Sequence, residues 1–122
     1  KSEAGKEVLW RLLKDADIFL EGFRPGVIKR LGFDYDTVSA RVPRLLYVSI
    51  SGYGDTGPML PRPGQDLLVQ AFSGTVMNAG TEGGLPHPSP VYIVDVAASH
   101  NACEAVLAGI IQRDRRGVAV EA

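Results

Sequence analysis

The sequence PVYIVDVAAS at residues 90–99 decides the fold class of this chain. A short apolar, β-prone run over residues 91–94 stops at Asp95, and a helix-like segment of small residues begins at once. This pattern predicts a buried strand with an acid at its carboxyl end, beside the N-terminus of a helix. Open α/β sheets bind their ligands there, because loop backbone and helix dipoles converge outside the strand ends. Asp95 is therefore the first candidate for chemistry, although Asp is also a favoured N-cap, whose carboxylate accepts hydrogen bonds from backbone N–H groups.

The rest of the chain alternates between strand and helix patterns. We predict further strands over residues 17–21, 44–51 and 118–122, and helices over 3–14, 27–31, 36–41, 66–72 and 96–113. Long loops are expected over 52–64 and 78–90, where Gly and Pro dominate. Strands that alternate with helices favour a parallel sheet. The predicted fold class is therefore α/β, with a Rossmann-like parallel sheet flanked by helices.

Composition limits the kinds of partner that we expect. The 122 residues fit one compact domain. The formal net charge of −1 gives no bulk attraction to nucleic acid or to a membrane of anionic lipid. No apolar run reaches the roughly 18 residues that span a bilayer. The lone Cys103 cannot form an internal disulfide, and no Cys/His cluster suggests a metal site, so a cytoplasmic setting fits best.

Both ends of the chain suggest that it belongs to a longer protein. The chain opens on KSEAG, without an initiator Met, and closes on VAVEA, a strand pattern with nothing after it. A parallel strand that is buried on both faces needs a neighbour on each side. We therefore expect residues 1–122 to form a single partial domain of a longer enzyme.

Several motifs follow one another along the chain. They are GFRPGV at 22–27, RLG at 30–32, PRLLY at 43–47, SISGYGDTGP at 49–58, PGQD at 63–66, QAFSG at 70–74 and VD at 94–95. This ordered set resembles the class III CoA-transferases, such as the formyl-CoA:oxalate and carnitine CoA-transferases, and the related α-methylacyl-CoA racemases. The resemblance covers essentially the whole chain. It implies that residues 1–122 are the central part of the large, CoA-binding domain of such an enzyme.

The resemblance implies that Asp95 is a nucleophile. In the family, the matching Asp attacks an acyl-CoA to give a mixed anhydride, which the CoA thiolate converts into an aspartyl-CoA thioester. A small carboxylic acid then repeats the exchange in reverse and leaves as the new acyl-CoA. The family also implies no permanently bound cofactor, CoA as part of the substrate, and a homodimer in the full-length enzyme. We expect the isolated chain to be inactive and able to self-associate through exposed sheet edges.

Residues in two of the motifs match positions where relatives bind CoA. They are Gly22, Phe23, Arg24 and Arg30 in the first region, and Pro63, Gly64, Gln65 and Asp66 in the second. A cation suits the phosphates of the nucleotide, and an aromatic ring suits its adenine or pantetheine arm. Two alternatives stay open, since Arg30 also suits a helix end and Phe23 also suits a core. Most family members have Asn in place of Gly22, which leaves only a backbone contact there.

Gln65 separates the transferase hypothesis from its main alternative. The resembling racemases carry His at this position as a second acid/base beside the Asp, and a glutamine cannot carry protons. Gln65 therefore favours a transferase over a racemase or epimerase, and a non-catalytic CoA-binding or scaffold fragment is the third hypothesis. The other candidates have structural interpretations. We expect structural or solvated positions for His87 and His100, a packed core position for Cys103, and a solvated helix end at 113–116.

Overall fold

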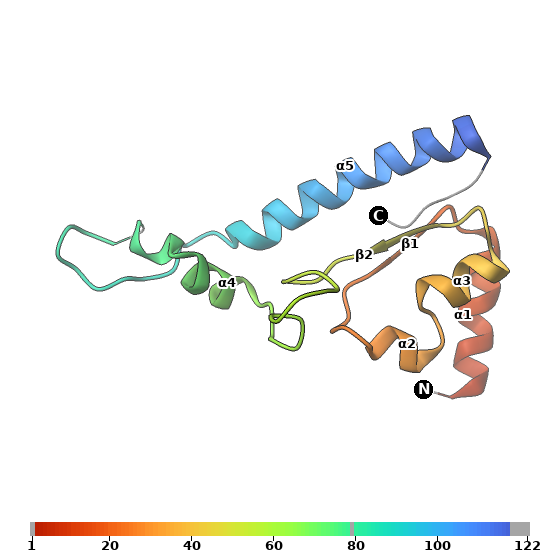
Figure 1. Cartoon of the computed structure of the whole chain (residues 1–122), viewed down its shortest axis with the longest axis horizontal. Coiled ribbons are helices and arrows are strands. Elements are labelled where there is room, and N and C mark those ends of the chain that lie inside the picture. The colour runs from red at the N-terminus through yellow and green to blue at the C-terminus, as the bar shows by residue number, and fades with distance from the viewer. Residues whose placement is uncertain (1, 79, 118–122) are drawn as a thin grey trace.

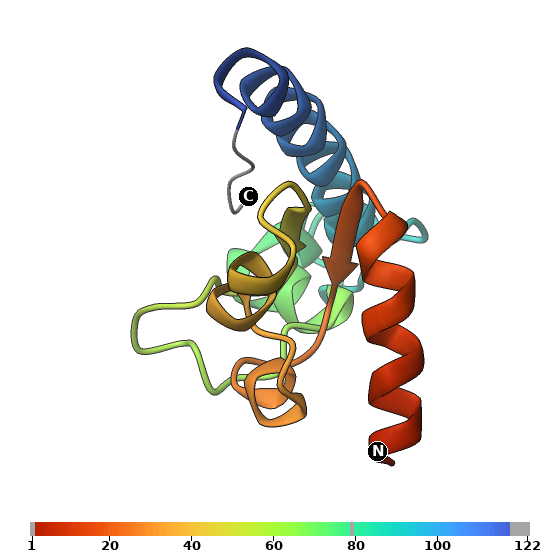
Figure 2. The same cartoon turned by 90° about the vertical axis from the view of Figure 1, so that its right-hand side faces the viewer.

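The computed structural model describes residues 2–78 and 80–117, so the predicted strand over 118–122 lies outside the described residues. Helices precede, separate and follow two strands, but only helices follow the second strand in the described residues. Their bounds are α1 Glu3–Asp15, β1 Ile18–Glu21, α2 Val27–Leu31, α3 Tyr35–Arg41, β2 Leu46–Ser49, α4 Asp66–Ser73, the short 3₁₀ helix η1 Thr75–Met77 and α5 Ile93–Arg116. Figure 1 shows α5 on one side of the two strands and α1, α2 and α3 on the other. In Figure 2, α1 and α5 extend away from the strands in opposite directions.

The described sheet consists of β1 and β2, which run parallel. The register pairs Ile18 with Leu46 at one end and Glu21 with Ser49 at the other. The helices α2 and α3 lie between the two strands in sequence, and a parallel pair requires such a crossover because a tight hairpin would return the chain antiparallel. The predicted parallel α/β arrangement is confirmed.

The main core lies between the sheet and the N-terminal helices. Leu13 of α1, Val38 of α3 and Tyr47 of β2 are buried together with Phe33 and Leu45. The Tyr47 hydroxyl donates a hydrogen bond to the Phe33 carbonyl at 3.0 Å, so the buried phenol has a partner. This core packs the two strands against α1 and α3. It thereby fixes the position of their carboxyl ends relative to those helices.

The long helix α5 meets the sheet through a glycine. Side chains alternate between the two faces of a strand, so Leu46 lies on the face opposite Tyr47. A Cβ added to Gly109 of α5 would lie 2.6 Å from the Leu46 Cδ1 atom, so the buried Leu46 side chain would have to shift to admit one. Cys103, predicted to pack in a core, is instead exposed. Gly109 is the only residue of α5 that is buried, so the helix approaches the sheet closely there.

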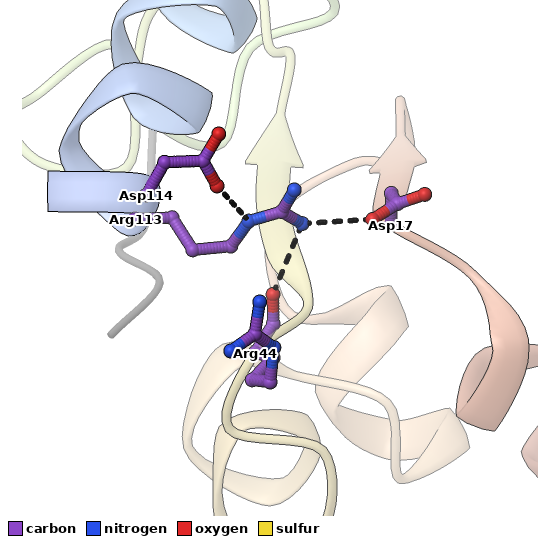
Figure 3. Close-up of polar contacts among 4 residues, drawn as sticks. All are labelled: Asp17, Arg44, Arg113 and Asp114. Atoms are coloured by element: carbon purple, nitrogen blue, oxygen red, sulfur yellow. Dashed lines mark hydrogen bonds and ion pairs between the residues drawn. The ribbon is translucent and has the colours of Figure 1, made fainter. Parts of the chain in front are cut away.

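The C-terminal end of α5 is anchored by Arg113, whereas residues 114–116 are exposed as expected for a solvated helix end. The Arg113 side chain is only 11% exposed, and Nη1 donates to the Asp17 carboxylate at 3.0 Å and to the Arg44 carbonyl at 3.5 Å. Nε lies 3.4 Å from the Asp114 carboxylate. Figure 3 shows the guanidinium group between these partners, beside the amino ends of the two strands. The far end of α5 is thus tied to the edge of the sheet opposite the strands' carboxyl ends.

The predicted strand over 91–94 is wrong. Tyr92 is the N-cap of α5, and the helix begins at Ile93. A four-residue apolar run has no clear period, so the same residues suit either a short strand or a first helical turn. The preceding backbone is held by α4, where the Gln70 side chain accepts a hydrogen bond from the Ser89 N–H at 2.8 Å. Asp95 therefore lies in the first turn of a helix, not at the end of a strand.

By length and composition, α5 is the one helix in residues 2–78 and 80–117 that could cross a membrane. The sequence analysis expected no membrane-spanning segment, because it considered only uninterrupted apolar runs. In α5 polar and charged residues such as Asp95 and Glu104 interrupt the apolar positions, so no such run forms although the average hydropathy is high. The contacts of Gly109 and Arg113 described above are those of a helix packed on a sheet.

Candidate active site

A cleft of about 610 Å³ opens at the carboxyl ends of the two strands. Its walls are residues 22–25 after β1, residues 50–54 after β2, the loop over 62–65, and the first turns of α5 from Val94. This is the edge of a parallel sheet at which α/β folds bind their ligands. The sequence argument placed the site at this edge, and the structure brings Asp95 to it by way of a helix instead of a strand.

Asp95 is the only carboxylate among the described residues that line this cleft. It is the third residue of α5 and is exposed. The positive end of the helix dipole favours negative charge at this position. Tyr92, and not Asp95, is the N-cap of α5, so the capping role considered for Asp95 belongs to another residue. The carboxylate of Asp95 is left free to meet a ligand in the cleft.

The other predicted residues divide between the cleft and its surroundings. Six line the cleft beside Asp95: Gly22, Phe23, Arg24, Pro63, Gly64 and Gln65. Arg30 lies on α2 and borders a neighbouring pocket of about 450 Å³. Asp66 is buried and is not among the residues that line the cleft. Its Oδ1 atom instead accepts hydrogen bonds from the backbone N–H groups of Val94 and Asp95, at 2.7 and 3.2 Å.

Three arginines surround the neighbouring pocket. Arg24, Arg30 and Arg62 all border it, and Arg24 and Arg62 line the main cleft as well. Within the part of the chain that the structure describes, none of the three guanidinium groups has a hydrogen-bond or ion-pair partner. Unpaired arginines around a pocket suit phosphate oxygens, which accept bidentate hydrogen bonds. The sequence analysis missed Arg62, although its place next to the Pro63–Asp66 motif was a usable signal.

The sequence analysis also missed Glu21, whose buried carboxylate holds together two segments beside the cleft. Glu21 is the last residue of β1 and is 5% exposed. Its Oε2 atom accepts the Phe23 N–H at 2.9 Å, and its Oε1 atom accepts the Ser49 hydroxyl at 2.5 Å. One carboxylate therefore ties the start of the loop after β1 to the end of β2. The signal was present, because Glu21 is an acid directly after a short apolar strand.

We expect Glu21→Ala to loosen this wall of the cleft. The variant loses two hydrogen bonds to a charged group, and we expect the free energy of unfolding to fall by roughly 2 kcal/mol. Hydrogen exchange should accelerate over residues 22–26. Glu21→Gln is the matched control, because its amide oxygen can accept the Phe23 N–H while its NH₂ group donates to Ser49. Equal unfolding curves for the Ala and Gln variants in urea would contradict this role.

Two glycines allow the start and the end of the loop between β2 and α4 to come into contact. A Cβ on Gly52 would lie 2.4 Å from the Gly64 Cα atom, and a Cβ on Gly64 would lie 2.4 Å from the Gly52 Cα atom. The start and the end of the single loop between β2 and α4 therefore touch backbone to backbone. Only glycine, which has no Cβ, permits this close approach at either position.

No group of three or more His, Cys, Asp or Glu side chains suited to a metal ion is found in residues 2–78 and 80–117.

The family model described as CoA-transferase family III matches residues 1–121. The chain belongs to CoA-transferase family III. This confirms the resemblance drawn from the ordered motifs.

Named relatives of family III align with nearly the whole chain. A protein named probable fatty acyl-CoA transferase Rv3272, from Mycobacterium tuberculosis, is 41% identical over 118 residues, which are 97% of this chain and 30% of the relative. Succinyl-CoA:glutarate CoA-transferase from Mus musculus is 36% identical over 117 residues, which are 96% of this chain and 27% of the relative. The chain thus spans less than a third of the length of these curated relatives.

Solved structures of family III agree with the fold. A crystal structure of a CaiB/BaiF family protein from Brucella suis superposes with a TM-score of 0.91 at 32% identity, over 98% of this chain and 32% of that chain. A crystal structure of Rv3272 superposes with a TM-score of 0.89 at 40% identity, over 98% of this chain and 33% of that chain. The parallel sheet with its flanking helices is therefore one part of a larger family III architecture.

Proposed function

We propose that the protein carrying this chain transfers CoA from an acyl-CoA to a free carboxylic acid, with Asp95 as the nucleophile. One observation carries the proposal: Asp95 is the only carboxylate among the described residues lining the cleft, and it lies exposed in the first turn of α5. Family membership and the names of the relatives, which include a fatty acyl-CoA transferase and a succinyl-CoA:glutarate CoA-transferase, support the same activity.

In the first half of the proposed reaction, an Asp95 carboxylate oxygen attacks the thioester carbonyl carbon. The C–S bond breaks, CoA leaves as a thiolate, and Asp95 becomes part of a mixed anhydride. The thiolate then attacks the Asp95 carbonyl carbon, which releases the donor acid as a carboxylate. The product of this half is an aspartyl-CoA thioester. The free energy of the donor's thioester bond is thus kept in the new thioester bond between CoA and Asp95.

In the second half, the acceptor carboxylate attacks the aspartyl thioester and expels the CoA thiolate. The thiolate attacks the acceptor's carbonyl carbon in the new anhydride, and Asp95 leaves as a free carboxylate beside a new acyl-CoA. Each step exchanges one anion for another, so the cycle requires no proton transfer. The cleft fits this requirement, because no His is among its described lining residues and Gln65 does not ionise near neutral pH.

Gln65 also has a positive role in this proposal. Its side chain lines the same cleft as Asp95, and its NH₂ group can donate a hydrogen bond to the carbonyl oxygen on which negative charge develops. A racemase would need a second acid/base across the substrate from Asp95. Because the described lining of the cleft holds no His, no Glu and no second Asp for this task, the geometry favours transfer over exchange of an α-proton.

The three arginines support the binding of CoA phosphates in this proposal. We expect Arg62→Ala to raise KM for an acyl-CoA by about tenfold, the loss that corresponds to about 1.4 kcal/mol of binding free energy. The kcat should change by less than about threefold, since the phosphates lie away from the reacting carbon. Arg115→Ala, at the far end of α5, is the control and should leave both constants unchanged. A fall in kcat at unchanged KM would contradict this assignment.

Chemical trapping tests the covalent step. The full-length protein is incubated with a panel of acyl-CoAs and hydroxylamine, and its peptides are analysed by mass spectrometry. Hydroxylamine attacks an aspartyl-CoA thioester, releases CoA and leaves a hydroxamate, so we expect a hydroxamate on Asp95 that requires acyl-CoA. CoA transfer without this modification would overturn the nucleophile assignment. Deuterium uptake at the α-carbon of a 2-methylacyl-CoA, without transfer, would instead identify a racemase.

A further inference from the structure

The N-terminal turn of α5 is capped by a side chain from another helix. Tyr92, the N-cap, makes no capping hydrogen bond through its own side chain. Asp66 of α4 takes over this task, since its Oδ1 atom accepts the N–H groups of Val94 and Asp95. These are the second and third residues of the helix, whose N–H groups an N-cap side chain normally satisfies. The cap therefore acts on the residue that carries the proposed nucleophile.

Gln70 holds the capping carboxylate in place. It lies four residues after Asp66 on α4, and side chains at this spacing share one face of a helix. The Gln70 Nε2 atom donates to the Asp66 Oδ2 atom, and the Gln70 Oε1 atom accepts the Ser89 N–H at 2.8 Å. Nε2 also lies 3.5 Å from the Val91 carbonyl oxygen. Both the NH₂ group and the carbonyl oxygen of the Gln70 side chain thus have hydrogen-bond partners, which fixes the orientation of the amide.

Both side chains are removed from solvent. Asp66 is 6% exposed and Gln70 is fully buried, and neither has an unpaired buried polar atom. A buried carboxylate is stable only when its oxygens are occupied by donors, and here three donors meet two oxygens. Any change in the direction of a single donor would therefore disturb the whole set.

We propose that Asp66 and Gln70 form a clamp that positions Asp95 for attack, and this inference rests on the proposed function of Asp95. Asp66 is thereby a positioning residue, not a direct CoA ligand. The clamp fixes residues 89–95 against α4, and it fixes the direction of the Asp95 N–H bond. Because Asp95 lies in a helix, its φ angle relates the Cα–Cβ bond to that N–H, so the clamp helps to set how the carboxylate enters the cleft.

The test reverses the polarity of the clamp in the full-length protein. Asp66→Asn keeps the shape of the side chain but turns an NH₂ group toward the Gln70 NH₂ group or toward the helix amides. We expect kcat for CoA transfer to fall by about 10–100-fold, the loss typical of a misplaced reacting group, while KM for acyl-CoA changes by less than about threefold. Gln70→Glu places two carboxylates together and should give a loss of similar size.

The double variant Asp66→Asn/Gln70→Glu supplies the rescue. The introduced amide can donate to the introduced carboxylate, and that carboxylate can still accept the Ser89 N–H. We expect kcat to recover to within about fivefold of the unsubstituted protein, a non-additivity expected only for directly coupled residues. Asp15→Asn, at the end of α1, is the control for loss of one carboxylate and should leave kcat unchanged.

Hydrogen exchange over residues 93–96 separates failure of the clamp from failure of the proposed function. We expect faster exchange in each single variant and recovery in the double variant. An unsubstituted protein that transfers no CoA refutes the function of Asp95, and the positioning inference falls with it, whatever the exchange shows. Transfer at an unchanged kcat in Asp66→Asn overturns the clamp alone, as does a double variant that recovers neither kcat nor slow exchange.

Discussion

Asp95→Asn is expected to lower kcat for CoA transfer by on the order of 10⁴-fold or more, as removal of a covalent nucleophile does in other enzymes. The amide is close in size to the carboxylate, but its oxygen is a poor nucleophile and carries no full negative charge. The backbone N–H of residue 95 remains bonded to Asp66, so the helix should begin at the same place. Steady-state transfer between an acyl-CoA and an acceptor acid measures the loss, and circular dichroism checks that α5 is intact.

Glu104→Gln is the matched control for this experiment. It removes one negative charge from the same helix at an exposed position outside the cleft, and we expect less than a twofold change in kcat. Asp95→Ala should be as inactive as Asp95→Asn. A rate for both variants within about tenfold of the unsubstituted protein would show that the chemistry does not pass through Asp95.

Gly52→Ala is expected to have the largest effect on stability. The new Cβ would lie 2.4 Å from the Gly64 Cα atom, and a backbone atom cannot move aside as a side chain can. We expect the free energy of unfolding to fall by about 3 kcal/mol, the upper range for overpacking, measured from urea unfolding curves. The two ends of the loop between β2 and α4 would separate, and activity should fall with stability.

Gly22→Ala is the control for the glycine prediction, because it lies in the same cleft with room to spare. Its added Cβ would be 3.9 Å from the Ile50 carbonyl oxygen, an ordinary contact, and we expect a change below about 1 kcal/mol. Gly64→Ala should cost as much as Gly52→Ala. The pair together should cost less than the sum, since both substitutions open the same contact. Equal stabilities of the Gly52 and Gly22 variants would refute the backbone contact.

Periodicity and turn chemistry were enough to predict most elements from the sequence. The helix α1, the strand β2 and the helix α4 follow from local patterns whose length and spacing leave little choice. The segment over 91–94 does not, because four apolar residues are too few to show a period. The location of Asp95 at the ligand edge was nonetheless right. A helix N-terminus and a strand's carboxyl end meet at that edge in this class of fold.

Contacts between distant segments could not be predicted in this way. The Asp66 carboxylate bonds to backbone groups 28 and 29 residues further along the chain, and no local pattern marks such a cap. The contact between Gly52 and Gly64 could not be predicted either, because both glycines lie in one long loop rich in Gly and Pro. Burial along α5 was mispredicted at Cys103, since a helical stripe shows which side chains share a face but not whether anything covers that face.

Because α5 is held at both ends, its length matters as much as its composition. At 1.5 Å per residue, the stretch from Asp95 to Arg113 spans roughly 27 Å. Inserting or deleting one residue inside it would rotate one end against the other by about 100°. The Arg113 guanidinium could then not bond to Asp17 while the Asp95 carboxylate lies in the cleft. The helix acts as a fixed-length ruler across the sheet. Substitutions along its exposed sides should be tolerated far better than any change in residue count.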